Sequence, residues 1–402
     1  MRVLYINVNC KSNSTGKIVY DLYTQTRQAG YEAAVCFGRG PLVEEPDIYK
    51  FGLDWETLLH ALLTRVTGLT GCWSFFSTRR LLRFIDRYQP DVVHMHELHA
   101  YFVNLQPLYD YLARHQIPVV YTCHCEFAYT GKCGHAFECE GWKSGCGNCP
   151  QVKDYPKSMF FDFTSRMFRQ KRNQWEKLRN VVITTPSRWL ADRVKQSFLG
   201  QRDIRVVHNG INTAQIFHPS ETEALRKEHG LTDEKIVLAV APRLMHERKG
   251  GGWVVKLAQM MKDENVKFFM IGVENLKEEF PDNVVAMGKV TDQQKLAAYY
   301  SMADCFVICS EKETFSLTCA ESLCCGTPVA GFCAGAPETI FMQPQALFAP
   351  YGDLDCLAKY VRNQLNADFD RAELAQKMQL LYSADNMYRQ FEAIYKELTG
   401  EV

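Results

Sequence analysis

The sequence predicts an α/β protein that contains two doubly wound parallel sheets, and two stretches support this prediction. An apolar strand at Val3–Val8 is followed by a loop, an amphipathic helix at Lys17–Ala29 and a second apolar strand at Ala33–Phe37. The same order restarts at the strand Lys235–Ala241 and reaches the next strand at Val266–Gly272. A strand that leads through a helix to a neighbouring strand is the repeating unit of a doubly wound sheet, so we expect two such domains.

The composition narrows the class of protein. A chain of 402 residues has room for two or three domains. Its 46 Lys and Arg residues balance 46 Asp and Glu residues, so no global positive field favours nucleic acid as a partner. The sequence lacks an apolar run long enough for a membrane span, and Met1–Val8 resembles a strand rather than a signal peptide. We therefore expect a cytoplasmic chain whose 16 cysteines are reduced.

The stretch Cys305–Glu338 has the pattern of a ligand-binding strand end. A short apolar run at Cys305–Cys309 predicts a buried strand, and Phe315–Cys325 predicts the helix that follows the intervening loop. Gly326 and Pro328 end that helix before the next strand begins. Ligands of open parallel sheets bind in the crevice outside such strand ends.

Two glutamates mark this stretch. Glu313 lies where the strand gives way to the helix N-terminus, which favours anions, and Glu321 lies eight residues later on the helix. Eight helical residues span about 12 Å at 1.5 Å per residue. Two carboxylates so separated could hold the hydroxyl-rich ends of one ligand whose phosphates lie at the helix start. A sugar nucleotide has that form.

The loop Pro242–Gly250 is a second candidate site, at the end of the strand that opens the second domain. It carries Arg243 and Lys249, and two fixed cations at the mouth of a parallel sheet suit a diphosphate that gains charge as it leaves. Because Arg248 is adjacent to Lys249, the sequence does not decide which of the two is the second cation. A solvated basic loop is the alternative. Asp353 and Asp355 form a D-x-D pair, but they precede a helix, so we expect an N-cap rather than a metal site.

The segment from Glu313 to Leu317, with Ala320-Glu321-Ser322, resembles the E-x7-E element of retaining glycosyltransferases of family 4, which have the GT-B fold of two Rossmann-like domains. The segments Asn209–Asn212 and Phe217–Pro219 resemble the hinge of that family. The resemblance implies that Glu313 faces the transferred sugar and that Glu321 binds the nucleotide ribose. It also implies that the donor is bound by Phe315, Ser316 and Leu317, and its diphosphate by Arg243 and Lys249.

The same resemblance divides the chain. It implies an acceptor-side domain over residues 1–207, a nucleotide-sugar-binding domain over 208–384, and a last helix over 385–402 that packs back on the first domain. The loop around Gly16 is not a P-loop, because no glycine stands five residues earlier and Ile18 replaces the hydroxyl residue that binds magnesium. By resemblance, Gly16 lets the backbone approach the donor phosphate or the acceptor. A plain turn with an N-cap is the alternative.

A strand at Pro118–Thr122 ends at His124, which matches the histidine of the family's T-x-H-D motif. Cys125 stands where those relatives have Asp. A neutral imidazole at a strand end can accept a hydrogen bond from a substrate hydroxyl, and by resemblance His124 faces donor sugar and acceptor. We expect His94 and His96 to be structural.

A cysteine-rich insertion at residues 123–156 resembles one found in a colanic-acid and capsule subgroup of the same family. Cys146 and Cys149 have the spacing of a zinc knuckle, and Cys133 and Cys139 could complete a four-thiolate structural zinc site. Free thiols, or a redox pair at Cys146 and Cys149, are the alternatives.

Aromatic and basic residues alternate twice in the first half, around Phe75 and Phe76 with Arg79, and again within Arg166–Arg179. Such faces can rest on anionic lipid, which would place the protein peripherally at the inner face of the membrane. Solvated basic helices that pack their aromatics inward are the alternative.

Together these features predict a retaining glycosyltransferase of hexosyltransferase type. We expect it to transfer sugar from a nucleotide-diphosphate sugar to a lipid-linked or saccharide acceptor in capsule or exopolysaccharide synthesis. Side-chain cations would replace a metal, so the reaction would be metal-independent and need no cofactor. Two alternatives remain: a sugar-nucleotide epimerase or phosphorylase, and a zinc-knuckle binding module on a catalytically silent scaffold.

Overall fold

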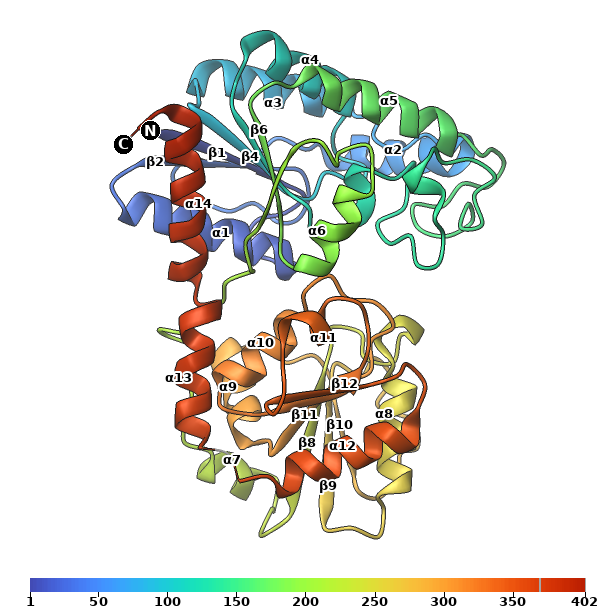
Figure 1. The fold of residues 1–402 in the computed structure, drawn as a ribbon, viewed down its shortest axis with the longest axis vertical. Helices are drawn as coiled ribbons and strands as arrows, with labels where there is room; N and C mark the ends of the chain where they lie inside the picture. Colours follow the sequence, from blue (N-terminus) through green and yellow to red (C-terminus); the bar gives the residue numbers. More distant parts are fainter. Residues whose placement is uncertain (369, 402) are drawn as a thin grey trace. The chain divides into compact units, whose positions relative to one another are not determined.

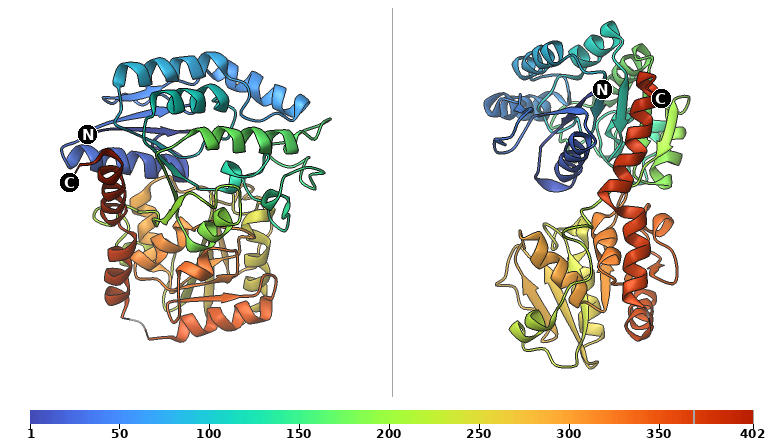
Figure 2. Two further views of the ribbon diagram at one scale, coloured as in Figure 1. Left: turned by 45° about the horizontal axis from the view of Figure 1, so that its top comes forward. Right: turned by 90° about the vertical axis from the view of Figure 1, so that its left-hand side faces the viewer.

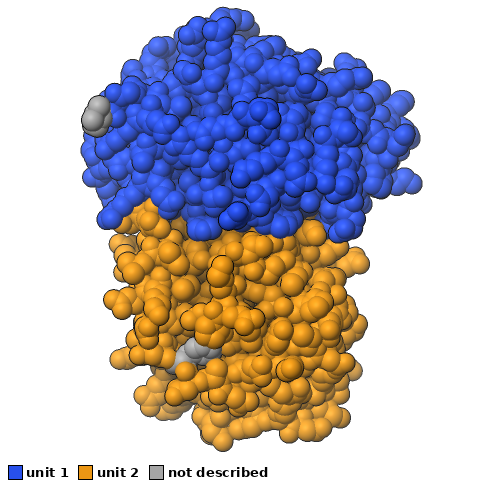
Figure 3. All heavy atoms as spheres, viewed as in Figure 1, with its two compact units in different colours: residues 1–208, 387–402 blue, residues 209–386 orange. Residues whose placement is uncertain are grey.

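The computed structural model describes residues 1–368 and 370–401 of the chain. These form two compact units: unit 1 consists of residues 1–208 and 387–402, and unit 2 of residues 209–386 (Figure 3). The first boundary therefore falls one residue after the expected position 207, and the second two residues after position 384. Among the described residues, no helix is long and apolar enough to cross a membrane.

Unit 1 is built on a seven-stranded sheet in the order β3-β2-β1-β4-β5-β6-β7, and each neighbouring pair is parallel (Figure 1). The strands are β1 (Arg2–Asn7), β2 (Glu32–Phe37), β3 (Ile48–Lys50), β4 (Val92–Met95), β5 (Val119–Thr122), β6 (Val181–Thr185) and β7 (Asp203–Val206). The central strands are continuous apolar runs because helices cover both faces of the sheet (Figure 2).

The helices of unit 1 alternate with these strands. They are α1 (Asn13–Gln28), α2 (Asp54–Thr67), α3 (Phe75–Tyr88), α4 (Leu105–His115), α5 (Thr164–Lys177) and α6 (Arg188–Lys195). Leu4 and Ile6 of β1 belong to one buried cluster with α3 and α4. The intervening Tyr5 points to the other face, where its hydroxyl bonds Thr26 of α1 at 2.7 Å. Because successive side chains of β1 point to opposite faces of the sheet, the strand packs against the helices on both faces.

Unit 2 repeats this plan with six parallel strands in the order β10-β9-β8-β11-β12-β13. The strands are β8 (Lys235–Val240), β9 (Val266–Ile271), β10 (Val284–Met287), β11 (Cys305–Ile308), β12 (Val329–Phe332) and β13 (Ala346–Ala349). Ile236 and Leu238 of β8 enter one core cluster, while Val237 and Ala239 enter the other. Unit 2 therefore has an apolar core on each face of its sheet.

The helices of unit 2 divide between these cores. They are α7 (Glu223–Glu228), α8 (Gly251–Met260), α9 (Gln293–Met302), α10 (Leu317–Cys324), α11 (Pro337–Ile340), α12 (Leu354–Asn366) and α13 (Arg371–Tyr382). Helices α9 and α10 supply one cluster, and α8 and α12 the other. Asp353 caps α12, because its carboxylate accepts a hydrogen bond from the Cys356 N–H at 3.0 Å, as expected for a D-x-D at a helix start.

The last helix, α14 (Ala384–Thr399), begins in unit 2 and continues into unit 1 (Figure 1). The Tyr395 hydroxyl bonds Nδ1 of His94 at 2.7 Å, and Glu397 pairs with Arg205 at 2.7 Å. The part of α14 that belongs to unit 1 therefore contributes to the helical cover of the first sheet.

Candidate active site at the strand ends

Each sheet has a point where the strand order reverses, and the candidate residues gather in the loops that follow those strands. In unit 2, β8 lies between β9 and β11, so the loops after β8 and β11 leave the sheet side by side. The first loop contains Arg243 and Lys249, and the second contains Glu313. This is the place where open α/β sheets bind ligands.

The structure brings two of the expected donor residues together. The Lys249 ammonium donates to Oε1 of Glu313 at 2.7 Å, across the two loops. Gly250 has a φ of 74°, and a Cβ there would lie 2.1 Å from the carbonyl oxygen of Cys309. Only glycine therefore lets the Lys249 loop approach the end of β11 this closely. The Glu313 backbone is fixed in turn, because its N–H donates to the Ala334 carbonyl at 2.9 Å.

Arg243 lies on the same loop but in a more open position. Its Nε contacts Oε1 of Glu274 at 3.2 Å, and 71 % of its side chain is exposed. The neighbouring Arg248 uses its backbone carbonyl to accept a hydrogen bond from Glu311 N–H at 3.0 Å. The contact between the Lys249 ammonium and Glu313 favours Lys249 as the second cation.

The helix after Glu313 begins later than the sequence suggested. We expected it at Phe315, but α10 starts at Leu317, because Ser316 takes a left-handed conformation with φ 76° and caps the helix. Its hydroxyl accepts from Cys319 N–H at 3.4 Å. The Phe315 ring is buried against Phe341 and Tyr382, each with a centroid distance of 5.9 Å. The ring is therefore part of the unit 2 core, so the expected donor contact of Phe315 would involve its backbone.

Glu321 lies on α10 with 9 % of its surface exposed. Its Oε2 accepts a hydrogen bond from the Tyr300 hydroxyl of α9 at 2.9 Å. Burial, together with this carboxylate, raises the pKa of Tyr300 well above its usual value, so Tyr300 remains a donor. No sequence pattern indicated Tyr300, because α9 and α10 meet only in the folded unit.

In unit 1 the corresponding loops follow β1 and β4. Helix α1 begins at Asn13, so Gly16 lies inside the helix rather than in the loop before it, which corrects our expected start at Lys17. A Cβ at Gly16 would lie 2.4 Å from Oδ1 of Asn9. Its small size therefore lets the loop after β1 fold onto the first turn of α1. The side chain of Asn7, the last residue of β1, accepts a hydrogen bond from Glu97 N–H at 3.1 Å and so links the loop after β4 to the end of β1.

Three histidines line the ends of β4 and β5. His94 bonds Tyr395 and Thr122, each at 2.7 Å, and Nδ1 of His96 bonds Nε2 of His124 at 2.9 Å. Burial lowers the pKa of His124 to about 4 and holds the pKa values of His94 and His96 well below the usual value of an imidazole. These imidazoles are neutral near pH 7, and the structure holds His94 and His96 inside the protein, as expected.

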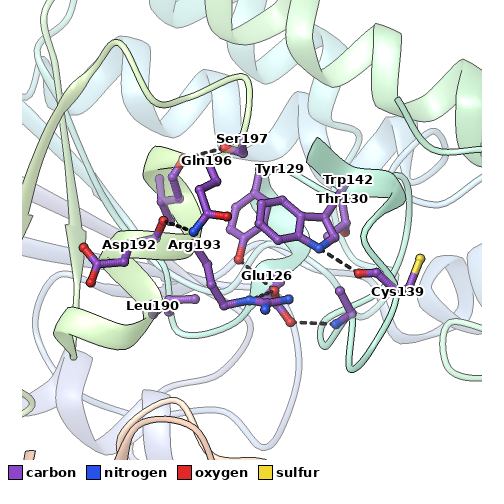
Figure 4. A network of polar contacts seen from close by, with 12 residues as sticks. Glu126, Tyr129, Thr130, Cys139, Trp142, Leu190, Asp192, Arg193, Gln196 and Ser197 are labelled. Atoms are coloured by element: carbon purple, nitrogen blue, oxygen red, sulfur yellow. Dashed lines mark hydrogen bonds and ion pairs between the residues drawn. The ribbon is translucent and has the colours of Figure 1, made fainter. Parts of the chain in front are cut away.

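The cysteine-rich insertion is anchored by a buried carboxylate (Figure 4). Glu126 accepts hydrogen bonds from Arg193 Nε at 2.7 Å, from the Tyr129 hydroxyl at 2.9 Å and from Ala136 N–H at 2.6 Å. The Arg193 guanidinium also lies 4.8 Å from the ring of the buried Trp142. Sequence reasoning missed this network, because Arg193 lies 67 residues beyond Glu126.

Two lysines hold the insertion through backbone carbonyls. Lys132 donates to the carbonyls of Val152, Asp154 and Pro156, and Lys171 to those of Phe127 and Thr130. Burial lowers the pKa of Lys171 to about 7. The insertion thus has ordering contacts besides its thiols.

The thiols of Cys133, Cys139, Cys146 and Cys149 belong to this insertion. In the described part of the chain, no three of them bring their sulfur atoms within 4.8 Å of one another. Burial raises the pKa of Cys133 to about 12 and raises those of Cys146 and Cys149. Four-thiolate zinc binding stays a prediction.

Helix α5 matches the alternative in which a basic helix packs its aromatic side chains into the protein. Phe168 and Trp175 are 4 % and 2 % exposed, so this basic helix buries its aromatics. The start of α3 differs, since Phe75 and Phe76 are 58 % and 62 % exposed.

Comparison with known proteins places the chain in a family. The family models "Glycosyltransferase Family 4" and "Glycosyl transferases group 1" match residues 15–215 and 234–367. The putative colanic acid biosynthesis glycosyl transferase WcaC of Escherichia coli K12 is 24% identical over 99% of this chain and 100% of its own length. The alpha-monoglucosyldiacylglycerol synthase of Streptococcus pneumoniae is 30% identical over 48% of this chain and 46% of its own.

Among solved structures, sucrose-phosphate synthase from Thermosynechococcus elongatus aligns with a TM-score of 0.70 at 18% identity over 100% of both chains. Anabaena HepE in complex with UDP-glucose aligns with a TM-score of 0.65 at 14% identity, again over 100% of both. At these identities the likeness concerns the fold, which is GT-B.

Proposed function

The chain belongs to glycosyltransferase family 4, and from this premise we propose that it transfers a sugar from a nucleotide-diphosphate sugar with retention at the anomeric carbon. The observation that carries the proposal is the Lys249–Glu313 pair at the point where the unit 2 sheet reverses its strand order. In this pair, an ammonium that can bind a phosphate lies beside a carboxylate that can bind a sugar hydroxyl. The acceptor in this proposal is a saccharide or a lipid-linked saccharide of a surface polysaccharide.

The charges around this pair suit a diphosphate. Lys249 and the exposed Arg243 project from one loop, and both can reorient toward phosphate oxygens because their present partners are carboxylates at or near the surface. The developing negative charge on the departing diphosphate would strengthen these contacts in the transition state. HepE, which shares the fold, is known in complex with UDP and UDP-glucose, and this supports a nucleotide-sugar donor.

The proposed chemistry needs no divalent metal at the diphosphate, because Arg243 and Lys249 supply the positive charge. The acceptor hydroxyl attacks on the face from which the diphosphate departs, and the departing phosphate takes the hydroxyl proton. Glu313 would orient the transferred sugar through its hydroxyls. His124, neutral through burial, would accept a hydrogen bond from a substrate hydroxyl rather than carry charge.

An exposed apolar surface supports a membrane-associated acceptor. It consists of α2, the start of α3 and the segment 159–161, and its exposed side chains are Trp55, Leu58, Leu59, Leu62, Val66, Phe75, Phe76, Met159, Phe160 and Phe161. The parts adjoin: the Trp55 and Phe76 rings lie 5.9 Å apart, and Met159 N–H donates to the Arg65 carbonyl at 2.7 Å. Arg65 and Arg79 are exposed beside it. Such a surface suits insertion into anionic lipid, with the protein peripheral at the cytoplasmic face.

The donor proposal is tested with a panel of sugar nucleotides and lipid-linked or free saccharide acceptors. We expect one donor to give a glycoside whose anomeric configuration, read by NMR, matches that of the donor. The Lys249→Ala variant should give little product. Interconversion of the donor's sugar without transfer would instead identify an epimerase, and binding without any turnover would identify a silent scaffold.

The membrane proposal is tested by co-sedimentation with vesicles that contain anionic phospholipid. Wild-type protein should pellet with these vesicles, and the double variant Leu58→Asp, Leu62→Asp should stay in the supernatant. Leu380→Asp is the matched control, because Leu380 is 71 % exposed on α13 in unit 2, outside the apolar surface. Equal pelleting of all three proteins would refute a specific contact through α2.

A further inference from the structure

Three side chains with metal-binding atoms meet at the ends of β4 and β5, outside the four-cysteine set. Glu97 and His99 follow β4, and Cys125 follows β5. These strands are parallel neighbours, so their following loops leave the sheet at one edge. The Glu97 carboxylate lies 3.0 Å from Nε2 of His99 and 2.9 Å from Sγ of Cys125. In the described part of the chain, this is the trio whose ligand atoms all lie within 4.8 Å of one another.

Further hydrogen bonds hold the residues of the trio. Nδ1 of His99 faces the Tyr155 hydroxyl at 3.5 Å, which leaves Nε2 directed at Glu97. The Phe127 backbone N–H hydrogen-bonds the Cys125 sulfur. The Glu97 backbone N–H donates to Asn7 at 3.1 Å. The Tyr155 contact is of the kind that orients a metal-binding histidine through its second ring nitrogen.

The ligand types select the metal. A thiolate, an imidazole and a carboxylate together suit zinc, whereas calcium and magnesium prefer oxygen ligands alone. Zinc with three protein ligands keeps a fourth position for water. The trio is 7 to 20 % exposed, so an ion there is shielded but reachable.

We propose that Glu97, His99 and Cys125 bind one zinc ion in unit 1. On binding, the Cys125 thiol proton is released to solvent, and the sulfur exchanges its hydrogen bond to Glu97 for a bond to the metal. Relatives with the T-x-H-D motif have Asp at the position of Cys125, so the thiolate is a feature of this chain. The ion is held by unit 1 residues, whereas the proposed diphosphate contacts come from unit 2, so this proposal stands independently of the sugar transfer.

The test titrates cobalt(II), a spectroscopic substitute for zinc, into full-length, reduced, metal-free protein. The variant Cys146→Ser, Cys149→Ser serves as background, because it removes two competing thiols of the insertion. We expect one cobalt per chain, with a sulfur-to-cobalt charge-transfer band that stoichiometric zinc abolishes. In this background Cys125→Ser should abolish the band, and His99→Asn should weaken cobalt binding at least tenfold.

Matched controls are Cys72→Ser and His115→Asn, which alter the same residue types in unit 1 outside the trio. Both should leave the titration unchanged. If the background variant does not fold by circular dichroism, the same question is answered by metal analysis of purified wild type and Cys125→Ser, which should differ by one zinc per chain. No charge-transfer band in the folded background, a band that survives Cys125→Ser, or equal zinc contents would each overturn the proposal.

Discussion

The strand-end loops of the two units differ in how they present polar groups. In unit 2, Lys249 and Glu313 pair with 37 % and 17 % of their side chains exposed, and Arg243 is 71 % exposed. In unit 1, the imidazoles of His94 and His96 are almost entirely buried, and His124 is 9 % exposed. The strand ends of unit 2 therefore present exposed cations, whereas the imidazoles at the strand ends of unit 1 are neutral and enclosed.

Burial explains the difference. Removal from water disfavours a charged imidazole, so the unit 1 histidines stay neutral and act through directed hydrogen bonds. Exposed cations keep their charge and remain free to move toward a new anion. Substitutions in the buried polar networks of unit 1 should therefore reduce stability. Substitutions of the exposed cations in the loop after β8 of unit 2 should reduce activity and leave stability intact. The predictions below test this comparison.

The largest expected effect is on folding, from Glu126→Gln in unit 1. The buried carboxylate holds Arg193, Tyr129 and Ala136, and breaking a buried ion pair on one side costs about 3 kcal/mol or more. Urea unfolding followed by tryptophan fluorescence should report this loss. Glu176→Gln is the control, because Glu176 pairs with Arg172 at the surface and should cost at most about 0.5 kcal/mol. Equal urea midpoints for Glu126→Gln and Glu176→Gln would contradict a larger role of the buried carboxylate in stability.

The second effect is on catalysis. Lys249→Ala should lower kcat/KM about 100-fold, or about 2.7 kcal/mol, because it removes a cation whose contact with the diphosphate strengthens in the transition state. Its urea midpoint should stay close to wild type. Lys256→Ala on α8 is the control, since Lys256 is exposed and lies over the Trp253 ring. A Lys249→Ala protein as destabilised as Glu126→Gln would contradict the comparison.

A smaller effect is expected from Arg243→Ala, because Arg243 is the more exposed of the two cations. The kcat/KM should fall at least about tenfold, or about 1.4 kcal/mol. Steady-state kinetics with the identified donor measure it. Turnover equal to wild type would exclude Arg243 from the diphosphate site.

The smallest effect is expected from Gly16→Ala. The new methyl would meet Oδ1 of Asn9 at 2.4 Å, so the loop after β1 must shift, at a cost of about 1 kcal/mol. Urea unfolding should show this loss. Gly252→Ala on α8 is the control, because a Cβ there meets nothing within 4 Å and alanine favours the helix. A Gly16→Ala protein as stable as Gly252→Ala would show that the close approach is unimportant.

Local pattern in the sequence was enough to predict the two sheets and the unit 2 loop. Strands such as Cys305–Ile308 are short apolar runs, and Gly326 and Pro328 give direct signals for the end of the helix that follows. The Asp353 cap was likewise visible, because a cap acts within three residues of its own position. These features depend on neighbours in the chain, so the sequence by itself determined them.

The tertiary structure alone decided which distant groups meet. The sequence does not indicate that Glu126 pairs with Arg193, that His94 bonds Tyr395 across 301 residues, or that Glu97 lies beside Cys125. It also did not show that Gly16 lies inside α1 against Asn9, because this contact forms only when the preceding loop folds back onto the helix. Periodicity and turn residues report the backbone within a few positions. Pairing between side chains far apart in the chain depends on how the sheet and its helices pack, and only the folded chain fixes that packing.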